Sequence, residues 1–169
     1  MTDLFANILS SETLLIGARL GVAMILGMII GAERILAHKT AGMRTYALVS
    51  MGSALFIIIS LIITSRYENV TVFDPMRLAA QIVSAAGFIC AGLVIVRKDG
   101  IVGLTSSAGL WVSVGIGMAS GFGLYNVAII ATILTLFIFV VLWFVEKSLQ
   151  KTKLYEMIQT NEIKTLDEE

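Results

Sequence analysis

The feature that constrains this chain most is a stretch of 45 residues, from Ile101 to Val145, that contains no charged residue. A single α-helix of that length would measure roughly 67 Å, because each residue adds ~1.5 Å. The hydrocarbon core of a bilayer is only ~30 Å thick, so the stretch is expected to cross a membrane twice. The glycine-rich segment SGFGLYN, Ser120–Asn126, is the predicted reversal, since Gly121 and Gly123 can adopt positive φ angles.

The rest of the chain has the same character. Hydrophobic residues make up 57% of the sequence and charged residues 14%, against ~45–50% and ~25% in soluble domains. The apolar residues come in long blocks rather than with the 3.6-residue period of a surface helix. We therefore expect an all-α integral membrane bundle of five transmembrane helices in residues 1–145, followed by a short polar tail, residues 146–169. The predicted spans are Thr13–Ile30, Thr45–Ile63, Met76–Val96, Leu104–Ser120 and Leu124–Val145.

The positions of the basic residues predict the orientation. The first loop contains Arg34, Lys39 and Arg44, the third contains Arg97 and Lys98, and the polar tail adds four lysines. Short loops rich in Lys and Arg remain in the cytoplasm. We therefore expect the N-terminus outside and the C-terminus in the cytoplasm. The first twelve residues lack the positive charge of a secretory signal, so no cleavage is expected.

Several classes of function find little support in the sequence. The formal net charge is zero, which argues against nucleic-acid binding. His38 is the only histidine, and no nucleophile and base can be paired by spacing, so we expect no enzymatic activity. No carboxylate lies near the middle of a predicted span, so neither a metal site nor a cofactor is expected. The single cysteine, Cys90, excludes an intrachain disulfide.

Small residues recur at every fourth position in three of the predicted spans. Such spacing places them on one helix face, where a neighbouring backbone can approach closely in lipid. The small residues are Gly109, Ser113, Gly117 and Gly121 in the fourth span, Gly17/Gly21 and Gly27/Gly31 in the first, and Ala80/Ser84 and Gly87/Ala91 in the third. They could pack a monomeric bundle or form the interface of a homo-oligomer.

Polar residues near the ends of the spans suggest two clusters. Arg19 is the deepest charge, and on the same predicted outer side Asp74 reads as an N-cap before Pro75. With Arg77 and Gln81, four residues apart on one helix face, these residues could form an outer polar cluster.

The second predicted cluster lies on the inner side. Glu33 and Arg34 end the first span near Arg44 and Thr45, with Arg97 and Asp99 on the same side. Charges at membrane depth are costly and usually have a partner or a task. Both clusters could therefore hold helix ends together by pairing their charges, or they could belong to a polar site or pathway through the bundle.

Four segments of the chain, taken in order, resemble the membrane domain of the MgtC/SapB family. They read GAER, AGMRTYALVSMGSALF, DPMRLAAQIVSAAGFICAG and GLTSSAGLWVSVGIGMASGFGLY, and the likeness runs from about Leu15 to Phe144. The family pattern maps onto Arg19, Glu33, Arg34, Gly42, Arg44, Thr45, Asp74, Arg77, Gln81, Gly103, Leu104, Thr105 and Trp111. Ala85 and Cys90 stand where the pattern has glycine. Many members continue into a cytoplasmic ACT-like domain, for which the 24 residues after Val145 are too few.

The resemblance implies a multi-pass protein of the bacterial inner membrane, linked to growth in low magnesium and to survival inside host cells. Family members are thought to regulate other membrane proteins, including ATP synthase. The leading hypothesis is therefore a non-enzymatic regulator of membrane proteins or ion homeostasis. The alternatives are an oligomeric transporter or channel for Mg²⁺ or another cation, and a structural subunit of a larger membrane complex.

Overall fold

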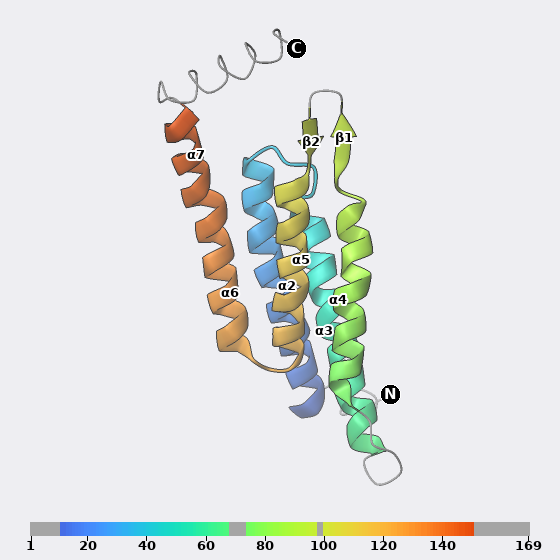
Figure 1. Ribbon diagram of the computed structural model, residues 1–169. Helices are drawn as coiled ribbons and strands as arrows, with labels where there is room; N and C mark the ends of the chain where they lie inside the picture. The colour runs from blue at the N-terminus through green and yellow to red at the C-terminus, as the bar shows by residue number, and fades with distance from the viewer. Residues whose placement is uncertain (1–10, 68–73, 98–99, 151–169) are drawn as a thin grey trace. The chain divides into compact units, whose positions relative to one another are not determined.

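The computed structural model describes residues 11–67, 74–97 and 100–150, which are almost entirely helical (Figure 1). In chain order the elements are α2 (Ser11–Leu36), α3 (Met43–Arg66), α4 (Pro75–Ala91), β1 (Ile95–Arg97), β2 (Gly100–Val102), α5 (Leu104–Gly121), α6 (Tyr125–Phe137), the π-helical turn η1 (Ile138–Leu142) and α7 (Trp143–Gln150). The chain divides into two compact units, residues 1–135 and 136–169.

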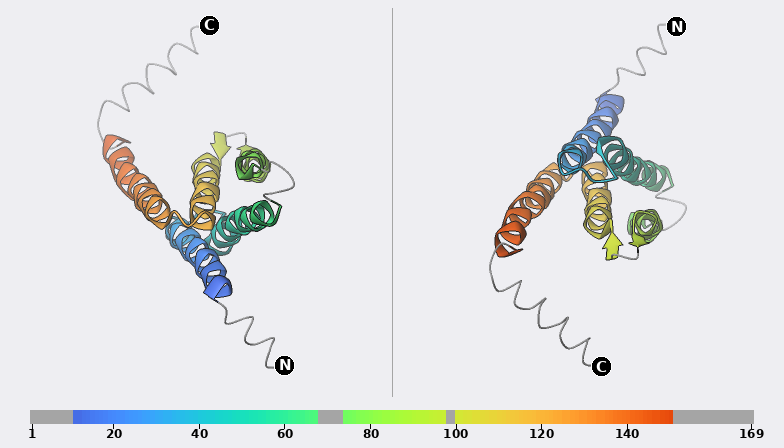
Figure 2. Two further views of the ribbon diagram at one scale, coloured as in Figure 1. Left: turned by 90° about the horizontal axis from the view of Figure 1, so that it is seen from below. Right: turned by 90° about the horizontal axis from the view of Figure 1, so that it is seen from above.

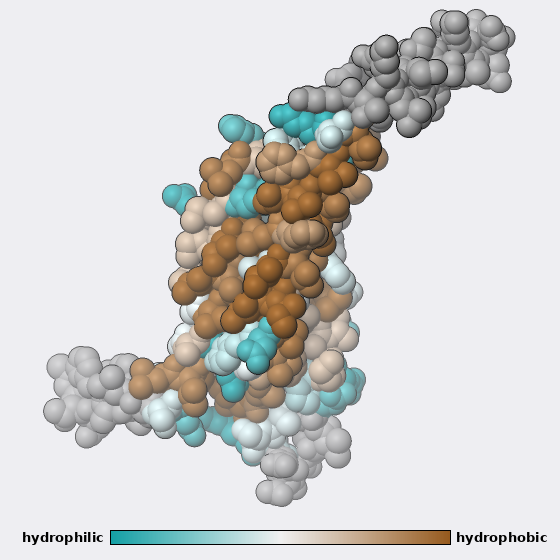
Figure 3. Space-filling view, turned by 90° about the vertical axis from the view of Figure 1, so that its left-hand side faces the viewer, coloured by the Kyte–Doolittle hydropathy of each residue, from teal (hydrophilic) through white to brown (hydrophobic). Residues whose placement is uncertain are grey.

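The predicted set of five helical segments is confirmed. Three of the described helices are long and apolar enough to cross a membrane: Ser11–Leu36, Met43–Arg66 and Tyr125–Leu149. The apolar helix α4 is shorter, with 17 residues, and α5 has 18. Hydrophobic side chains cover most of the middle of the face shown in Figure 3, as expected for a surface that meets lipid.

Within the first unit, α2, α3 and α5 pack against one another, and α4 lies against α3 and α5 (Figure 2). Glycines permit the closest approaches in this packing. A Cβ atom at Gly27 would lie 2.6 Å from the Tyr46 carbonyl oxygen, and one at Gly117 would overlap the Ser50 carbonyl oxygen. Any larger residue would push the helices apart, so α2, α3 and α5 form a close-packed core.

Serine hydroxyls connect the backbones of the packed helices. Ser50 on α3 donates to the Ala23 carbonyl of α2 at 2.7 Å, and Ser113 on α5 donates to the Tyr46 carbonyl of α3 at 3.3 Å. Ser107 on α5 donates to the Cys90 carbonyl of α4 at 2.6 Å. These bonds satisfy polar groups that would otherwise be costly in hydrocarbon, and they add to the association of the helices.

The third span is shorter than predicted. The apolar pattern predicted that this helix would continue to Val96. That prediction is wrong, because α4 ends at Ala91. The segment beyond forms an antiparallel hairpin in which Ile95 pairs with Val102. Isoleucine and valine favour strands, and apolar content alone does not distinguish a strand from the end of a helix.

The turn between α5 and α6 lies where the sequence predicts it. Gly123 adopts a positive φ of 80°, whereas Gly121 is the last residue of α5 and its missing side chain leaves room for Ala54 and Ile57 of α3. The two glycines of one predicted turn thus have different tasks, one conformational and one in packing.

The second unit contains the end of the long C-terminal helix. In it, the π-helical turn η1 follows α6 directly and is followed by α7, where Lys147 Nζ lies 4.9 Å from the centre of the Trp143 ring. Most of the predicted polar tail, residues 151–169, lies outside the described residues.

Candidate functional site

Arg19 lies half-buried on α2, where it meets the C-terminal end of α5. Its Nη1 donates to the carbonyl oxygen of Gly121, the last residue of α5, at 3.0 Å. The carbonyl oxygen of Arg19 in turn accepts a 2.7 Å hydrogen bond from the Ser120 hydroxyl. The last carbonyls of a helix lack partners and carry a partial negative charge. The end of α5 therefore serves as the counter-group of this cation.

The four residues of the predicted outer cluster lie on two helices, with Arg19 on α2 and the other three at the start of α4. Asp74 caps its own helix, as predicted, and its Oδ1 accepts from the Met76 backbone N–H at 2.9 Å. Arg77 and Gln81 are exposed. Among the residues that the structure describes, no hydrogen bond or ion pair joins Arg19 to Asp74, Arg77 or Gln81. Arg19 bonds instead to the C-terminal end of α5. Charge patterns in the sequence do not reveal a backbone partner of this kind.

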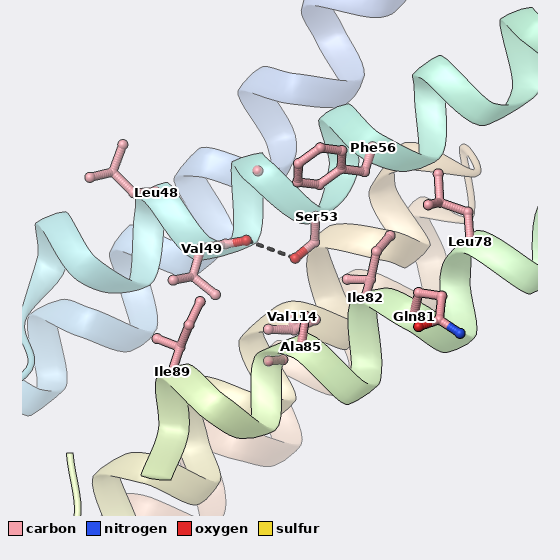
Figure 4. Close-up of a pocket in the computed structure, with 12 residues that line it drawn as sticks. Leu48, Val49, Ser53, Phe56, Leu78, Gln81, Ile82, Ala85, Ile89 and Val114 are labelled. Atoms are coloured by element: carbon pink, nitrogen blue, oxygen red, sulfur yellow. Dashed lines mark hydrogen bonds between the residues drawn. The ribbon is translucent and has the colours of Figure 1, made fainter. Parts of the chain in front are cut away.

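Gln81 lies instead beside a groove between α3 and α4 (Figure 4). The groove has a volume of about 420 Å³, and apart from Gln81 its only polar side chain is Ser53, whose hydroxyl donates to the Val49 carbonyl at 2.8 Å. The remaining lining is apolar and comes from α3, α4 and α5: Leu48, Val49, Gly52, Phe56, Leu78, Ile82, Ala85, Ala86, Ile89 and Val114. Such walls suit hydrocarbon better than a hydrated ion.

At the opposite end of α2, Arg34 forms an ion pair with its neighbour Glu33. Arg34 is 3% exposed, and the Glu33 side chain is 16% exposed. Removing one member of so buried a pair leaves an uncompensated charge, which is costly. The pair therefore neutralises the Arg34 guanidinium where it is buried at the end of α2.

Tyr46 and Ser106, which were not predicted as site residues, connect α3 and α5. Tyr46 is fully buried, and its hydroxyl donates to the Ser106 carbonyl of α5 at 2.7 Å. A tyrosine within an apolar block is the only signal that the sequence offered, and its partner lies 60 residues away.

Arg44 and Thr45, assigned to the same cluster by sequence, lie in the first turn of α3 and line a different groove. This groove runs between α2 and α3 and has a volume of about 630 Å³. Within the described ranges, no carboxylate pairs with Arg44. Of the predicted inner cluster, Glu33 and Arg34 thus form a buried ion pair, and Arg44 and Thr45 line an open groove. Arg97 lies in β1, and Asp99 lies outside the described residues.

The comparison with protein families decides the identity of this bundle. Residues 20–148 match the model of the MgtC family. The chain belongs to the MgtC family. YhiD of Escherichia coli strain K12, whose name proposes a magnesium transporter, is 43% identical over 127 residues, which cover 71% of this chain and 57% of YhiD. Protein MgtC of Salmonella typhimurium strain LT2 is 44% identical over 114 residues, covering 68% of this chain and 46% of that protein.

SapB of Bacillus subtilis strain 168 is a more distant relative of this MgtC-family chain. It is 37% identical over 113 residues, covering 65% of this chain and 49% of SapB. The chain spans about half the length of the curated relatives that it matches. No solved structure matches it.

Two of the glycines singled out in this MgtC-family chain lie at the starts of helices. A Cβ atom at Gly42, the N-cap of α3, would lie 2.8 Å from the Ile35 side chain. Gly103 adopts a φ of 95° at the start of α5, against the Leu93 carbonyl. The position of Gly103 therefore requires a residue without a side chain, whereas a side chain at Gly42 would displace that of the exposed Ile35.

The remaining singled-out residues divide between the core and the surface. Gly31 packs against the backbone of Met43, and Gly109 and Ser113 are buried on α5. Thr105 and Trp111 are exposed on the outside of α5. The close-packed positions serve the bundle, whereas Thr105 and Trp111 are available to lipid or to a partner.

Proposed function

We propose that this MgtC-family chain is a non-enzymatic regulator of other membrane proteins in the bacterial inner membrane. The observation that carries the proposal is the closed packing of α2, α3 and α5. Backbones approach at Gly27, Gly31 and Gly117, and Arg19 and Arg34 are both paired with groups of the same chain. A bundle whose centre is filled in this way has its free surface on the outside, where it can contact other helices.

The grooves described above support the same proposal. Both lie between neighbouring helices at the periphery, and the groove between α3 and α4 is lined by no charged side chain. Among the described residues, no group of three or more His, Cys, Asp and Glu side chains could hold a metal ion. Apolar grooves and exposed aromatic residues such as Trp111 suit contacts with lipid or a transmembrane helix.

The proposed partners follow from family resemblance. They are other proteins of the inner membrane, with ATP synthase as the first to be tested, and a second copy of the chain. Exposed small residues of α4, including Ser84 and Gly87, leave a face on which another helix could approach.

A second candidate function is cation transport by an oligomer. Two observations favour it: the name of the relative YhiD, and the presence of the Glu33–Arg34 pair in a helix that can span the membrane. In a transporter that pair would lie on the ion path. A third candidate function is that of a structural subunit in a larger membrane complex. Such a subunit would have the same close packing but would not regulate other membrane proteins.

Flux measurements in liposomes that contain only this protein separate the first two candidates. We expect no uptake of Mg²⁺ or monovalent cations above that of empty liposomes. Robust uptake that is lost in Glu33→Gln would overturn the regulator proposal and establish transport. A known cation carrier in parallel liposomes shows that the assay detects flux.

Substitution of Glu33 also tests the regulator proposal in cells. Glu33→Gln removes one charge with little change of shape. It should lower stability, because the buried Arg34 loses its partner. The protein that still folds and reaches the membrane should have a weaker effect on growth in low magnesium, measured per amount of folded protein. The matched control is Arg97→Gln, which removes one charge from the hairpin. If Glu33→Gln protein accumulates normally and affects growth in low magnesium as the wild type does, the Glu33–Arg34 pair has only a structural role.

The proposed orientation has its own test. Cysteines placed at Ser65, at the end of α3, and at Arg97, in β1, lie at opposite ends of the bundle (Figure 1). With the N-terminus outside, Ser65→Cys should react with an impermeant maleimide on intact spheroplasts and Arg97→Cys only after lysis. The reverse pattern would invert the proposed topology.

A further inference from the structure

The groove between α2 and α3 combines a charged mouth with an apolar floor. Arg44, exposed, and Thr45, half-buried, lie at the end where α3 begins. Along α2 the groove runs from Ile35 to Met28 and Met24. Met24 lies about 16 Å from Ile35 along the helix axis, and Ala47 closes the opposite wall. The groove therefore extends from the end of the bundle toward the middle of the helices.

The charge at this mouth is uncompensated within the chain as described. Among the described residues, Glu33 forms an ion pair with the buried Arg34, and no carboxylate contacts Arg44. Further positive charge lies close by in sequence, at the exposed Lys39 of the preceding turn. An open arginine at the head of an apolar groove is complementary to an anion that carries a long hydrocarbon chain.

We propose that this groove binds an anionic phospholipid of the surrounding bilayer. The phosphate accepts hydrogen bonds from the Arg44 guanidinium and the Thr45 hydroxyl, and one acyl chain lies along Met24 and Met28. Methionine side chains are unbranched and adaptable, which suits a flexible chain of variable length and unsaturation. The site is independent of the proposed regulatory function, because it follows from the groove alone.

The shape of the groove selects a lipid over other occupants. Free phosphate would meet Arg44 and Thr45 and leave the methionine floor empty. Neutral phospholipid would fill the floor and bring a compensating positive headgroup to Arg44. Only an anionic lipid satisfies both parts of the groove.

The test measures lipid binding to the purified full chain in a neutral detergent, by thermal shift and by native mass spectrometry. Phosphatidylglycerol should raise the melting temperature more than phosphatidylcholine of the same acyl chains. Arg44→Gln should weaken phosphatidylglycerol binding about tenfold or more, because a charge-assisted hydrogen bond is lost. Arg97→Gln, a charge removal in the hairpin at the same end of the bundle (Figure 1), should leave binding within about threefold.

Four results would overturn the proposal. Equal losses in the two arginine variants would show attraction of anions to the whole basic end rather than to the groove. Equal stabilisation by the two phospholipids would remove the role of charge. Stabilisation by inorganic phosphate as strong as that by phosphatidylglycerol would identify a simple anion site.

Met24→Gln, which makes the partly exposed floor polar with little change of size, should weaken binding of long-chain but not of dihexanoyl phosphatidylglycerol. An equal effect on both lipids would place the acyl chain elsewhere.

Discussion

Helices α5 and α4 have nearly the same length and carry small residues at the same spacing, yet they pack differently. Gly117 and Gly121 of α5 lie against the backbone of α3, whereas a Cβ atom at Gly87 of α4 would meet nothing within 4 Å. Helix α4 instead buries Ala79, Ala86 and Cys90. The small residues that its sequence singles out, Ala80, Ser84, Gly87 and Ala91, are all exposed.

The difference teaches that small-residue spacing marks a face that another helix can approach, without identifying the partner. What distinguishes α5 is hydrogen bonding. Ser113 and Ser120 bond to the backbones of α3 and α2, and Ser107 reaches α4. Helix α5 is thus held on several sides, while α4 is held along one face. Pairs of matched substitutions, one in the close-packed core and one in α4, test this difference.

The largest effect is expected for Gly117→Ala compared with Gly87→Ala. The added methyl group at position 117 collides with the Ser50 carbonyl, so α3 and α5 must separate, at a cost of about 3 kcal/mol or more. At position 87 the methyl group enters open space, and replacing glycine within a helix stabilises it by roughly 0.5–1 kcal/mol. Thermal unfolding in detergent should shift in opposite directions. Equal shifts would show that the two faces pack alike.

A smaller effect is expected for Arg19→Gln compared with Arg77→Gln. Arg19 satisfies the end of α5, and its loss should cost about 1–3 kcal/mol. Arg77 is exposed, and its replacement should stay within about 0.5 kcal/mol. Denaturation with increasing sodium dodecyl sulfate measures both. A larger loss for Arg77→Gln would mean that the outer arginines form a network after all.

The smallest effect is expected for Ser107→Ala compared with Ser84→Ala. Ser107 provides a hydrogen bond between α5 and α4, so its loss should cost about 1 kcal/mol, and amide exchange should accelerate mainly in α4. Ser84 is exposed, and its replacement should change neither stability nor exchange. Uniform acceleration across α2, α3 and α5 would contradict the view that α4 is attached separately.

The sequence predicted features whose cause is local. Five apolar blocks predicted five helical segments, and the Asp74–Pro75 pair predicted the start of α4, because capping involves neighbouring residues only. The predicted end of α4 was wrong. Val94, Ile95 and Val96 are apolar residues that can continue a helix or form a strand, and the apolar pattern does not distinguish the two.

The candidate site depended on contacts that sequence patterns do not contain. The partner of Arg19 is a backbone carbonyl, which appears in no charge pattern. The partner of Tyr46 lies 60 residues away and is also a carbonyl. By contrast, the Glu33–Arg34 pair joins adjacent residues, and its members were identified as a charge pair directly.

The link between Arg19 and the end of α5 has a consequence for biosynthesis. Ser120, which bonds to the Arg19 carbonyl, follows it by 101 residues. At ~5–20 residues per second, the ribosome delivers that partner roughly 5 to 20 seconds after Arg19 itself. During this interval α2 and α3 lack the helix that completes their packing, and the Arg19 cation has no acceptor from α5. The nascent chain therefore has a defined period in which α2 and α3 are packed without α5.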